Sequence, residues 1–363
     1  MECFFPTVKE YQKELFASCT SLPCPVEQVC FFDIETTGLS PDISSLYLLG
    51  AAFVENGTWR LIQWYADDYI SEADILSAFS SFLAPFETVA HYNGSTFDIP
   101  YLEKKYSFHH LDSPFQGKRS LDLYRCFPLN KKLLPLPNRK LITVERSLGF
   151  QRHDTFTGKD CIKLYTDFMH LKFFRNDSAN RRKADLLLHN RDDLIGTVFC
   201  SRLLCYENYQ PKQPHWRTEE NTIVLCDQLD CPVSLPLTYQ KGDVQITMEH
   251  DLLTVQIPLY KGTLYHYFKD YKNYFYLPEE DMAVHKSVGI YVEEDFREKA
   301  TAANCYIKRS GFFLPVANDM ETDQPLFQET RRSRTIYVPW TETSTLSEKQ
   351  CQMYLTALMR RQR

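Results

Sequence analysis

The chain has 363 residues, which is long enough for two domains of ordinary size. Hydrophobic residues make up 44% of the sequence and charged residues 24%, a mixture that is typical of folded globular proteins and excludes a largely disordered one. The formal net charge of −6 argues against a protein that coats nucleic acid through a uniformly basic surface. Any surface that binds a phosphate backbone is therefore expected to be a local patch.

In the first part of the chain, strands are predicted over four apolar or alternating segments, residues 29–35, 46–55, 58–65 and 88–92. Asn56-Gly57 lies between the second and third of these segments and is a strong hairpin signal. Helices are predicted over residues 8–17, 71–83 and 179–205, and residues 98–205 are expected to be mostly helical. Asp177 and Ser178 are predicted to cap the long helix that begins near residue 179.

The composition changes after Pro211 and Pro214. Short segments of β-type residues follow and predict strands over residues 222–229, 243–249, 253–259, 274–277, 288–292 and 304–308, with a last helix over 346–360. We therefore expect an N-terminal extension over residues 1–27, an α/β domain over 28–210, and a smaller β-rich accessory domain with a C-terminal helix over 220–363.

The cysteines and the lack of long apolar runs predict where the chain resides. The 12 cysteines stand at irregular spacings without a C-x-x-C pair, so the sequence shows no zinc-finger spacing. The sequence does not open on a basic stretch followed by an apolar one, and no run of about 18 apolar residues could cross a membrane. We expect free thiols, a cytoplasmic location and no membrane partner.

Asp33 and Glu35 are the first candidate site residues. They stand two residues apart on a predicted strand, so both side chains project from the same face. Two ionised carboxylates held side by side repel each other, and a proton or a cation between them relieves the repulsion. Hard divalent cations such as Mg²⁺ and Mn²⁺ prefer oxygen ligands of this kind. The pattern is weak by itself, because many strand ends carry such a pair by chance.

Two later segments add carboxylates. Asp98 ends His91-Tyr-Asn-Gly-Ser-Thr-Phe-Asp98, just beyond a strand and a Gly-containing turn. Asp193 lies on a predicted helix, with His189 four residues earlier on the same helical face. Asp192 is a competing ligand, but neighbouring residues on a helix point about 100° apart, and we expect Asp192 to face solvent.

These segments resemble the three exonuclease motifs of the DEDD superfamily, which has a ribonuclease H-like fold, and within it the YprB-type ribonuclease H-like domain proteins. The resemblance covers roughly residues 28–205. It is carried by Phe32-Asp-Ile-Glu-Thr-Thr-Gly-Leu39, His91-Tyr-Asn-Gly-x-x-Phe-Asp-x-Pro-Tyr-Leu102 and His189-Asn-x-x-Asp193, with further agreement at Asp122, Lys140-Leu141, Glu145, Leu148-Gly149, Arg152 and Asp154. It implies an α/β fold in which helices flank a mixed sheet.

The resemblance also implies a 3′–5′ exonuclease that binds two divalent metal ions, Mg²⁺ or Mn²⁺, through Asp33, Glu35, Asp98 and Asp193. In many superfamily members a Tyr four residues before the last Asp, or a His five residues before it, positions or deprotonates the attacking water. His189 has the spacing of the first class and the identity of the second. It could accept a proton or hydrogen-bond the water, and the alternative is a structural histidine that bonds a neighbouring backbone group.

Residues beside the motifs are candidate contacts to nucleic acid, namely Thr36, Thr37, Gly38, Leu39, Tyr92 and Asn93. For the first four the alternative is a plain turn that ends the strand, and for Tyr92 it is packing in the core. Asp122 is expected either to support the site or, preferably, to cap a helix.

Three functions remain open at this point. The first is an exonuclease on single-stranded DNA or RNA ends, the second a catalytically silent module that binds nucleic acid or protein, and the third a structure-specific endonuclease with the same metal site. Loss of a carboxylate marks the silent modules, and all four carboxylates are present here, which favours an enzyme.

Overall fold

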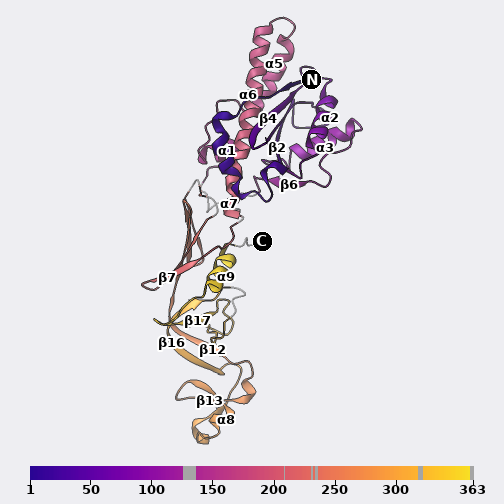
Figure 1. Cartoon of the computed structure of the whole chain (residues 1–363). Coiled ribbons are helices and arrows are strands. Elements are labelled where there is room, and N and C mark those ends of the chain that lie inside the picture. The colour runs from indigo at the N-terminus through magenta and orange to yellow at the C-terminus, as the bar shows by residue number, and fades with distance from the viewer. Residues whose placement is uncertain (126–135, 208, 230–231, 234–235, 318–321, 360–363) are drawn as a thin grey trace. The chain divides into compact units, whose positions relative to one another are not determined.

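A computed structural model of the chain describes all residues except 126–135, 208, 230–231, 234–235, 318–321 and 360–363 (Figure 1). The chain divides into two compact units. The first comprises Met1–Tyr209 with Asp230–Pro236, and the second comprises Gln210–Leu229 with Leu237–Arg363. Within the described residues no helix is long and apolar enough to cross a membrane.

A six-stranded mixed sheet forms the centre of the first unit, in the order β1-β4-β3-β2-β5-β6. Its strands are β1 (Glu2–Phe4), β2 (Val29–Thr36), β3 (Leu46–Glu55), β4 (Thr58–Tyr65), β5 (Thr88–His91) and β6 (Arg119–Asp122). β1 to β4 pair antiparallel, whereas β2, β5 and β6 run parallel. Asn56 and Gly57 join β3 to β4 with φ values of 51° and 66°, as the tight hairpin turn requires.

Helices cover both faces of this sheet (Figure 1). They are α1 (Gln12–Ser18), α2 (Glu72–Leu83), α3 (Asp98–Phe108), α4 (Leu141–Ser147), α5 (Gly158–Leu171), α6 (Asn176–Cys200) and α7 (Leu204–Glu207). Successive side chains of a strand point to opposite faces. Phe32 of β2 packs on Phe79 of α2, while its neighbour Asp33 bonds to Asn190 of α6. α2 and α6 therefore lie on opposite faces, and the expected mixed sheet flanked by helices is confirmed.

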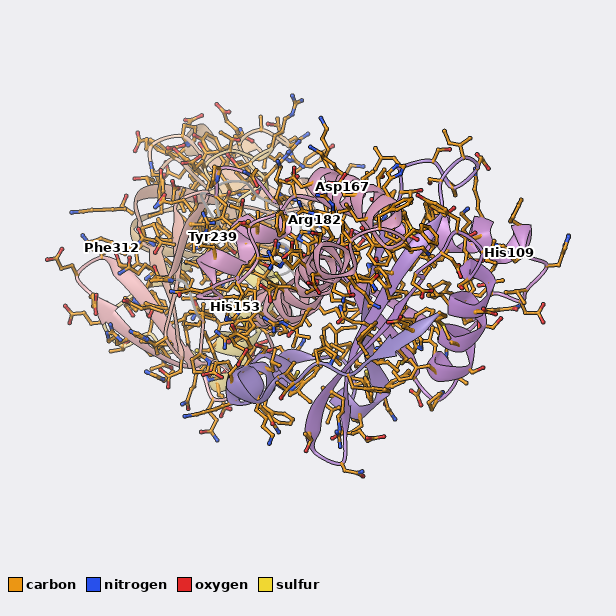
Figure 2. All side chains as sticks on the ribbon, turned by 90° about the horizontal axis from the view of Figure 1, so that it is seen from above. His109, His153, Asp167, Arg182, Tyr239 and Phe312 are labelled. Atoms are coloured by element: carbon orange, nitrogen blue, oxygen red, sulfur yellow. The ribbon has the colours of Figure 1, made fainter. Side chains whose placement is uncertain are left out.

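α5 and α6 pack against each other and carry Asp167 and Arg182, respectively (Figure 2). The first begins with a capping box in which Thr157 accepts a hydrogen bond from the backbone of Asp160. The prediction for the start of the second was wrong by about one turn. Asp177 and Ser178 lie inside the first turn of α6, and Arg175 is its N-cap without a side-chain bond.

The second unit is β-rich, as expected, and its sheets are antiparallel. A five-stranded sheet has the order β7-β8-β11-β10-β9, and two three-stranded sheets have the orders β12-β16-β17 and β14-β13-β15. The strands are β7 (His215–Glu219), β8 (Thr222–Gln228), β9 (Leu237–Lys241), β10 (Val244–Glu249), β11 (Leu252–Pro258), β12 (Tyr260–Tyr267), β13 (Tyr274–Leu277), β14 (Met282–His285), β15 (Glu298–Lys299), β16 (Tyr306–Pro315) and β17 (Tyr337–Trp340). The helices are α8 (Lys286–Gly289) and α9 (Glu348–Met359).

The strand predicted over residues 288–292 is wrong. The apolar run there is typical of a strand, but Lys286–Gly289 form the short helix α8. The backbone N–H of Ser287 donates to Nδ1 of His285 at 3.3 Å, which caps this helix locally. Val288 is consequently exposed instead of buried in a sheet.

Asp281 joins two sheets of the second unit. Its carboxylate accepts hydrogen bonds from the hydroxyls of Tyr276 at 2.7 Å and Tyr306 at 2.6 Å, and it lies 2.8 Å from Nζ of Lys308. The bonds from Lys308, Tyr306 and Tyr276 lower the pKa of Asp281 from 3.8 to about 2. Asp281 also has a φ of 52°, a conformation that Asn tolerates as well as Asp does.

Asp281→Asn should therefore test the charge without straining the backbone. We expect a loss of about 1 kcal/mol in the free energy of unfolding near neutral pH, discounted for screening because the side chain is 36% exposed. The pKa is lower in the folded state, so the carboxylate's contribution is complete above its unfolded pKa and disappears as the pH falls towards about 2. The difference in Tm between the wild type and the variant should shrink between about pH 5 and pH 2. A constant difference would show that the charge is not responsible.

Candidate metal centre

Three carboxylates from two elements meet on one face of the central sheet. Oxygen atoms of Asp33, Glu35 and Asp193 all lie within 4.8 Å of one another. Alternation along β2 points the first two to the same face, and α6, which packs on that face, supplies the third. Glu35 is buried, while Asp33 and Asp193 are partly accessible. The structure thus brings together residues that are about 160 positions apart in the sequence.

Asp98, the fourth expected ligand, begins α3 and is buried. Burial raises its pKa well above the ordinary value, and the nearby charges of Asp33 and Glu35 raise it further. Hydrogen bonds from the backbone of Asp98 itself and of Ile34 oppose this rise. Asp98 is therefore close enough to interact electrostatically with the strand pair, although it does not belong to the group within 4.8 Å.

Asp33 is held by a chain of amide hydrogen bonds. Nδ2 of Asn190 donates to Oδ2 of Asp33 at 2.9 Å, and Oδ1 of Asn190 accepts from Nε2 of Gln63 at 2.8 Å. α6 can come this close because the residue of β3 that faces it, Gly50, has no side chain. A Cβ on Gly50 would lie 2.1 Å from Oδ1 of Asn190. Gln63 was not predicted from the sequence, where its only signal is a polar residue within the apolar run Leu61-Ile-Gln-Trp-Tyr65.

The acidic pair is electrostatically strained. Burial raises the pKa of Asp33, and the charge of His189 and the Asn190 hydrogen bond lower it only in part. Burial likewise raises the pKa of Glu35; His189 opposes the rise and the charge of Asp33 adds to it. Without compensating positive charge these groups therefore tend to retain protons, and a bound cation would replace those protons.

His189 is buried among three carboxylates. Its Nδ1 is 2.9 Å from Oδ1 of Asp154, and its Nε2 is 3.4 Å from Oδ2 of Asp193 and 3.6 Å from Oε1 of Glu35. Burial lowers the pKa of His189, but the hydrogen bond with Asp154 and the charges of Glu35 and Asp154 outweigh burial and raise the pKa overall. The ring nitrogens contact carboxylates, whereas a purely structural histidine was predicted to bond a neighbouring backbone group.

Arg152 places a positive charge beside the acidic group. Its Nε lies 2.5 Å from Oε1 of Glu145, its Nη1 lies 3.2 Å from Oδ2 of Asp154, and its Nη2 contacts the carboxylate of Asp193. The sequence offered Arg152 and Asp154 only as matches to the resembled family. The structure places both in direct contact with residues of the centre.

The prediction that Asp192 faces solvent is wrong. Its side chain is fully buried, and its Oδ2 accepts hydrogen bonds from the backbone N–H groups of His153 at 2.6 Å and Asp154 at 3.0 Å. Its Oδ1 accepts from Arg191 at 3.0 Å. Asp192 does point away from the acidic cluster, but a loop covers that side of α6, and the carboxylate anchors the loop that carries Arg152 and Asp154.

The residues after the acidic pair form a turn that holds itself together. The hydroxyl of Thr36 donates to the carbonyl of Gly38 at 2.7 Å, and that of Thr37 accepts from the N–H of Ser45 at 2.8 Å. Leu39 and Ile43, on the same loop, are 81% and 90% exposed. The Thr hydroxyls thus shape the turn, while two apolar side chains remain accessible.

The second motif is also fixed by local bonds. The hydroxyl of Tyr92 donates to the carbonyl of Arg139 at 2.6 Å, and the N–H of Asn93, whose φ is 63°, donates to Oδ1 of Asp122 at 2.9 Å. Asp122 also accepts from the N–H of Tyr124 at 3.1 Å. The preferred helix-capping role for Asp122 is therefore wrong, since it ends β6 and holds the turn that leads to Asp98.

Comparisons with known proteins give one match whose bounds lie within this first unit. A family model described as the RNase_H superfamily matches residues 30–204. The family B DNA polymerase of Pyrobaculum calidifontis is similar at 14% identity and a TM-score of 0.39, with 69% of this chain and 35% of that one covered. An exonuclease I from Methylocaldum szegediense is similar at 12% identity and a TM-score of 0.30, with 55% of this chain and 54% of that one covered. No curated protein matches.

The similarity to these solved structures concerns the fold alone, and the chain spans between about a third and just over half of their length. Together with the family match, the order of strands and helices shows that the mixed sheet with flanking helices is ribonuclease H-like, followed by β-rich sheets. A candidate acidic metal site lies on this fold.

Gly50→Ala should disturb the centre without changing any ligand. The added methyl group would meet Asn190 and Leu194 of α6, and overpacking of this kind costs roughly 1–3 kcal/mol in the free energy of unfolding. Gly158→Ala is the matched control, since nothing lies within 4 Å of a Cβ there and its φ is not positive. Denaturant unfolding should show a loss for the first variant only, and equal stabilities would contradict the close approach of α6.

Proposed function

We propose that the chain is a metal-dependent nuclease, a 3′–5′ exonuclease of the DEDD type and YprB-like, that acts on single-stranded DNA or RNA ends. The observation that carries the proposal is the meeting of Asp33, Glu35 and Asp193, with buried Asp98 close enough to feel the charges of Asp33 and Glu35. Residues 28–210 would form the exonuclease domain and residues 220–363 an accessory domain.

The donor set fits hard divalent ions. All four side chains offer carboxylate oxygens, which Mg²⁺ and Mn²⁺ prefer, and their mutual repulsion favours a bound cation over empty ligands. Asp33, Glu35, Asp98 and Asp193 would hold two such ions. When bound, two divalent ions activate a water and stabilise the leaving 3′ oxygen.

The chain's own residues would position these ligands and the water. Asn190 fixes the carboxylate of Asp33, and Asp154 fixes the ring of His189 through Nδ1. Nε2 of His189 is left facing Glu35 and Asp193, where it could accept a proton from the water or hydrogen-bond it. The role of the general base is therefore assigned to His189 as part of the proposal.

Nucleic acid would approach along the turn after β2. Leu39 and Ile43 are exposed apolar side chains on the loop that follows the acidic pair, and they could contact the face of a terminal base. Thr36, Thr37 and Gly38 of this turn and the turn at Tyr92 and Asn93 complete the proposed contact set. The backbone N–H of Thr37 itself donates to the carbonyl of Ser45 at 2.9 Å. The side chain of Tyr92 would act through its ring, because its hydroxyl bonds to backbone.

Two alternatives share these residues. A silent binding module would not need to retain all four carboxylates, so the intact set favours catalysis. An endonuclease would use the same ions, and only the products distinguish it from an exonuclease.

Asp33→Asn and Asp193→Asn should each lower Mg²⁺- or Mn²⁺-dependent hydrolysis of a 5′-labelled single strand by more than roughly 100-fold, since changing even the supports of metal ligands costs about 10–100-fold. Asp74→Asn, the same change at an exposed position of α2, is the control. The wild type should give a ladder that shortens from the 3′ end, on DNA, RNA or both. Failure of the wild type to cut either polymer with either metal would overturn the proposed function.

His189→Ala should slow hydrolysis by about 10²–10⁴-fold if the imidazole accepts the proton in the rate-limiting step. The wild-type rate should fall as the pH drops through the pKa of His189, which stands above its ordinary value in the metal-free chain. The variant's rate–pH profile should lack this acidic limb. His189→Tyr, which introduces the tyrosine found at this spacing in the other class, is the variant for comparison of the rate–pH profiles. If His189→Ala hydrolyses at the wild-type rate, His189 has a structural role only.

A further inference from the structure

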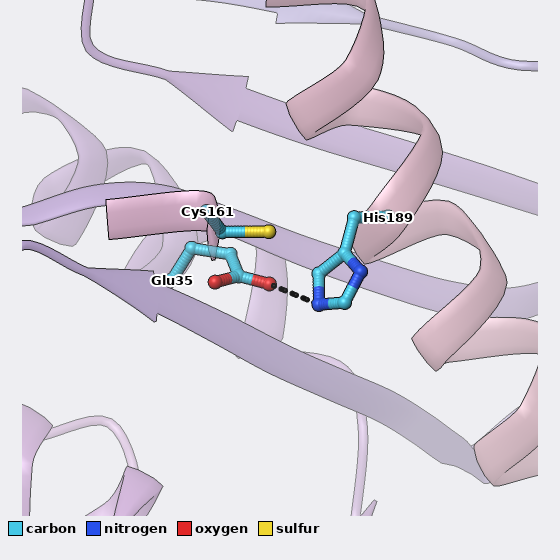
Figure 3. A group of neighbouring side chains, drawn as sticks. All are labelled: Glu35, Cys161 and His189. Atoms are coloured by element: carbon cyan, nitrogen blue, oxygen red, sulfur yellow. Dashed lines mark ion pairs between the residues drawn. The ribbon is translucent and has the colours of Figure 1, made fainter. Parts of the chain in front are cut away.

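A second group of possible ligands lies beside the carboxylates and includes a thiol. Ligand atoms of Glu35, Cys161 and His189 are all within 4.8 Å of one another, and all three side chains are buried (Figure 3). Cys161 lies in the first turns of α5, which places the sulfur next to the ring and the carboxylate. The three residues come from a strand and two helices, so the group depends on the packing of α5 and α6 over β2.

The donor chemistry of this group differs from that of the acidic cluster. A thiolate, an imidazole nitrogen and a carboxylate oxygen are typical ligands of Zn²⁺, which binds three protein groups and leaves a fourth position for water. Mg²⁺ and Mn²⁺ do not select sulfur. The two ligand sets share Glu35. The acidic cluster adds Asp33 and Asp193 to it, and the second group adds Cys161 and His189.

His189 is already oriented as a ligand. Oδ1 of buried Asp154 lies 2.9 Å from its Nδ1, an arrangement that in the neutral ring keeps the proton on Nδ1 and leaves the lone pair of Nε2 free. Nε2 is the nitrogen that faces Glu35, 3.6 Å from Oε1 (Figure 3). Carboxylate–histidine pairs of this kind commonly support bound zinc.

We propose that Glu35, Cys161 and His189 bind a thiophilic divalent ion, Zn²⁺, and that bound zinc inhibits the nuclease by withdrawing Glu35 from the hard-metal ligands. The inhibition rests on the proposed function, whereas the binding does not. Binding releases the thiol proton of Cys161 to solvent, so that the sulfur coordinates as a thiolate.

Co²⁺ provides the direct test, because it takes zinc-like sites and reports a bound thiolate by a charge-transfer absorption band. The full chain, freed of metal with a chelator, should gain this band on titration with Co²⁺ and lose it when Zn²⁺ is added. Cys161→Ser should lack the band. Cys200→Ser, a change at another buried cysteine of the same unit, should keep it.

Absence of the band in the wild type, or its persistence in Cys161→Ser, would overturn the site. The wild-type spectrum decides even if the Cys161 variant does not fold. Zinc should also inhibit Mg²⁺-dependent hydrolysis by the wild type, and Cys161→Ser should need about 10- to 100-fold more zinc for the same fractional inhibition of its own rate. Equal sensitivity of the two proteins would overturn the inhibitory role.

The two proposals fail separately. A thiolate band in a chain that hydrolyses neither polymer supports the zinc site and contradicts the nuclease. Hydrolysis without the band supports the nuclease and contradicts the zinc site.

Discussion

Mutual repulsion between buried carboxylates is the constraint on which the rest of the centre depends. β2 fixes Asp33 and Glu35 on one face, and α6 adds Asp193 within 4.8 Å. The surrounding groups reduce this repulsion, since Asn190 donates to Asp33 and Arg152 contacts Asp193. They do not cancel it, because burial still raises the pKa values of the strand pair. The fold thus holds carboxylates whose mutual repulsion divalent cations are suited to relieve.

α6 distributes the supporting roles over four of its residues, which lie close together in the sequence. His189 bonds to the carboxylate of Asp154, and Asn190 bonds to that of Asp33. Asp192 accepts from loop backbone, and Asp193 joins the acidic cluster. Close packing makes this possible. A Cβ on Gly50 or Gly196 would lie about 2 Å from a side-chain oxygen of Asn190 or Glu145, so glycine at both positions lets the helix reach the sheet and the Glu145–Arg152 pair.

Local patterns predicted the ligands, and long-range packing decided how they are supported. The strand bounds of β3 followed from an apolar run and those of β4 from alternation, with the Asn56-Gly57 turn between them. The acidic residues were recognisable in chain order. The burial of Asp192 was not predictable, because it depends on a loop 38 and 39 residues away in the sequence. Neither was the contact between Gln63 and Asn190, which spans 127 residues. The helix at Lys286 escaped prediction because a histidine side chain caps an apolar run.

The hydrogen bond between Asp154 and His189 links the two proposed properties of the centre. In the neutral ring this bond leaves Nε2 unprotonated and aimed at Glu35, which is the geometry required of a group that accepts a proton from water. An unprotonated Nε2 in the same direction is also a metal ligand, and the thiol of Cys161 stands beside it. A histidine oriented for catalysis at this position is therefore unavoidably oriented for zinc. Which ion binds Glu35 then depends on the other donor atoms. Asp33 and Asp193 offer oxygen, which suits Mg²⁺ or Mn²⁺, whereas His189 and Cys161 offer nitrogen and sulfur, which suit Zn²⁺.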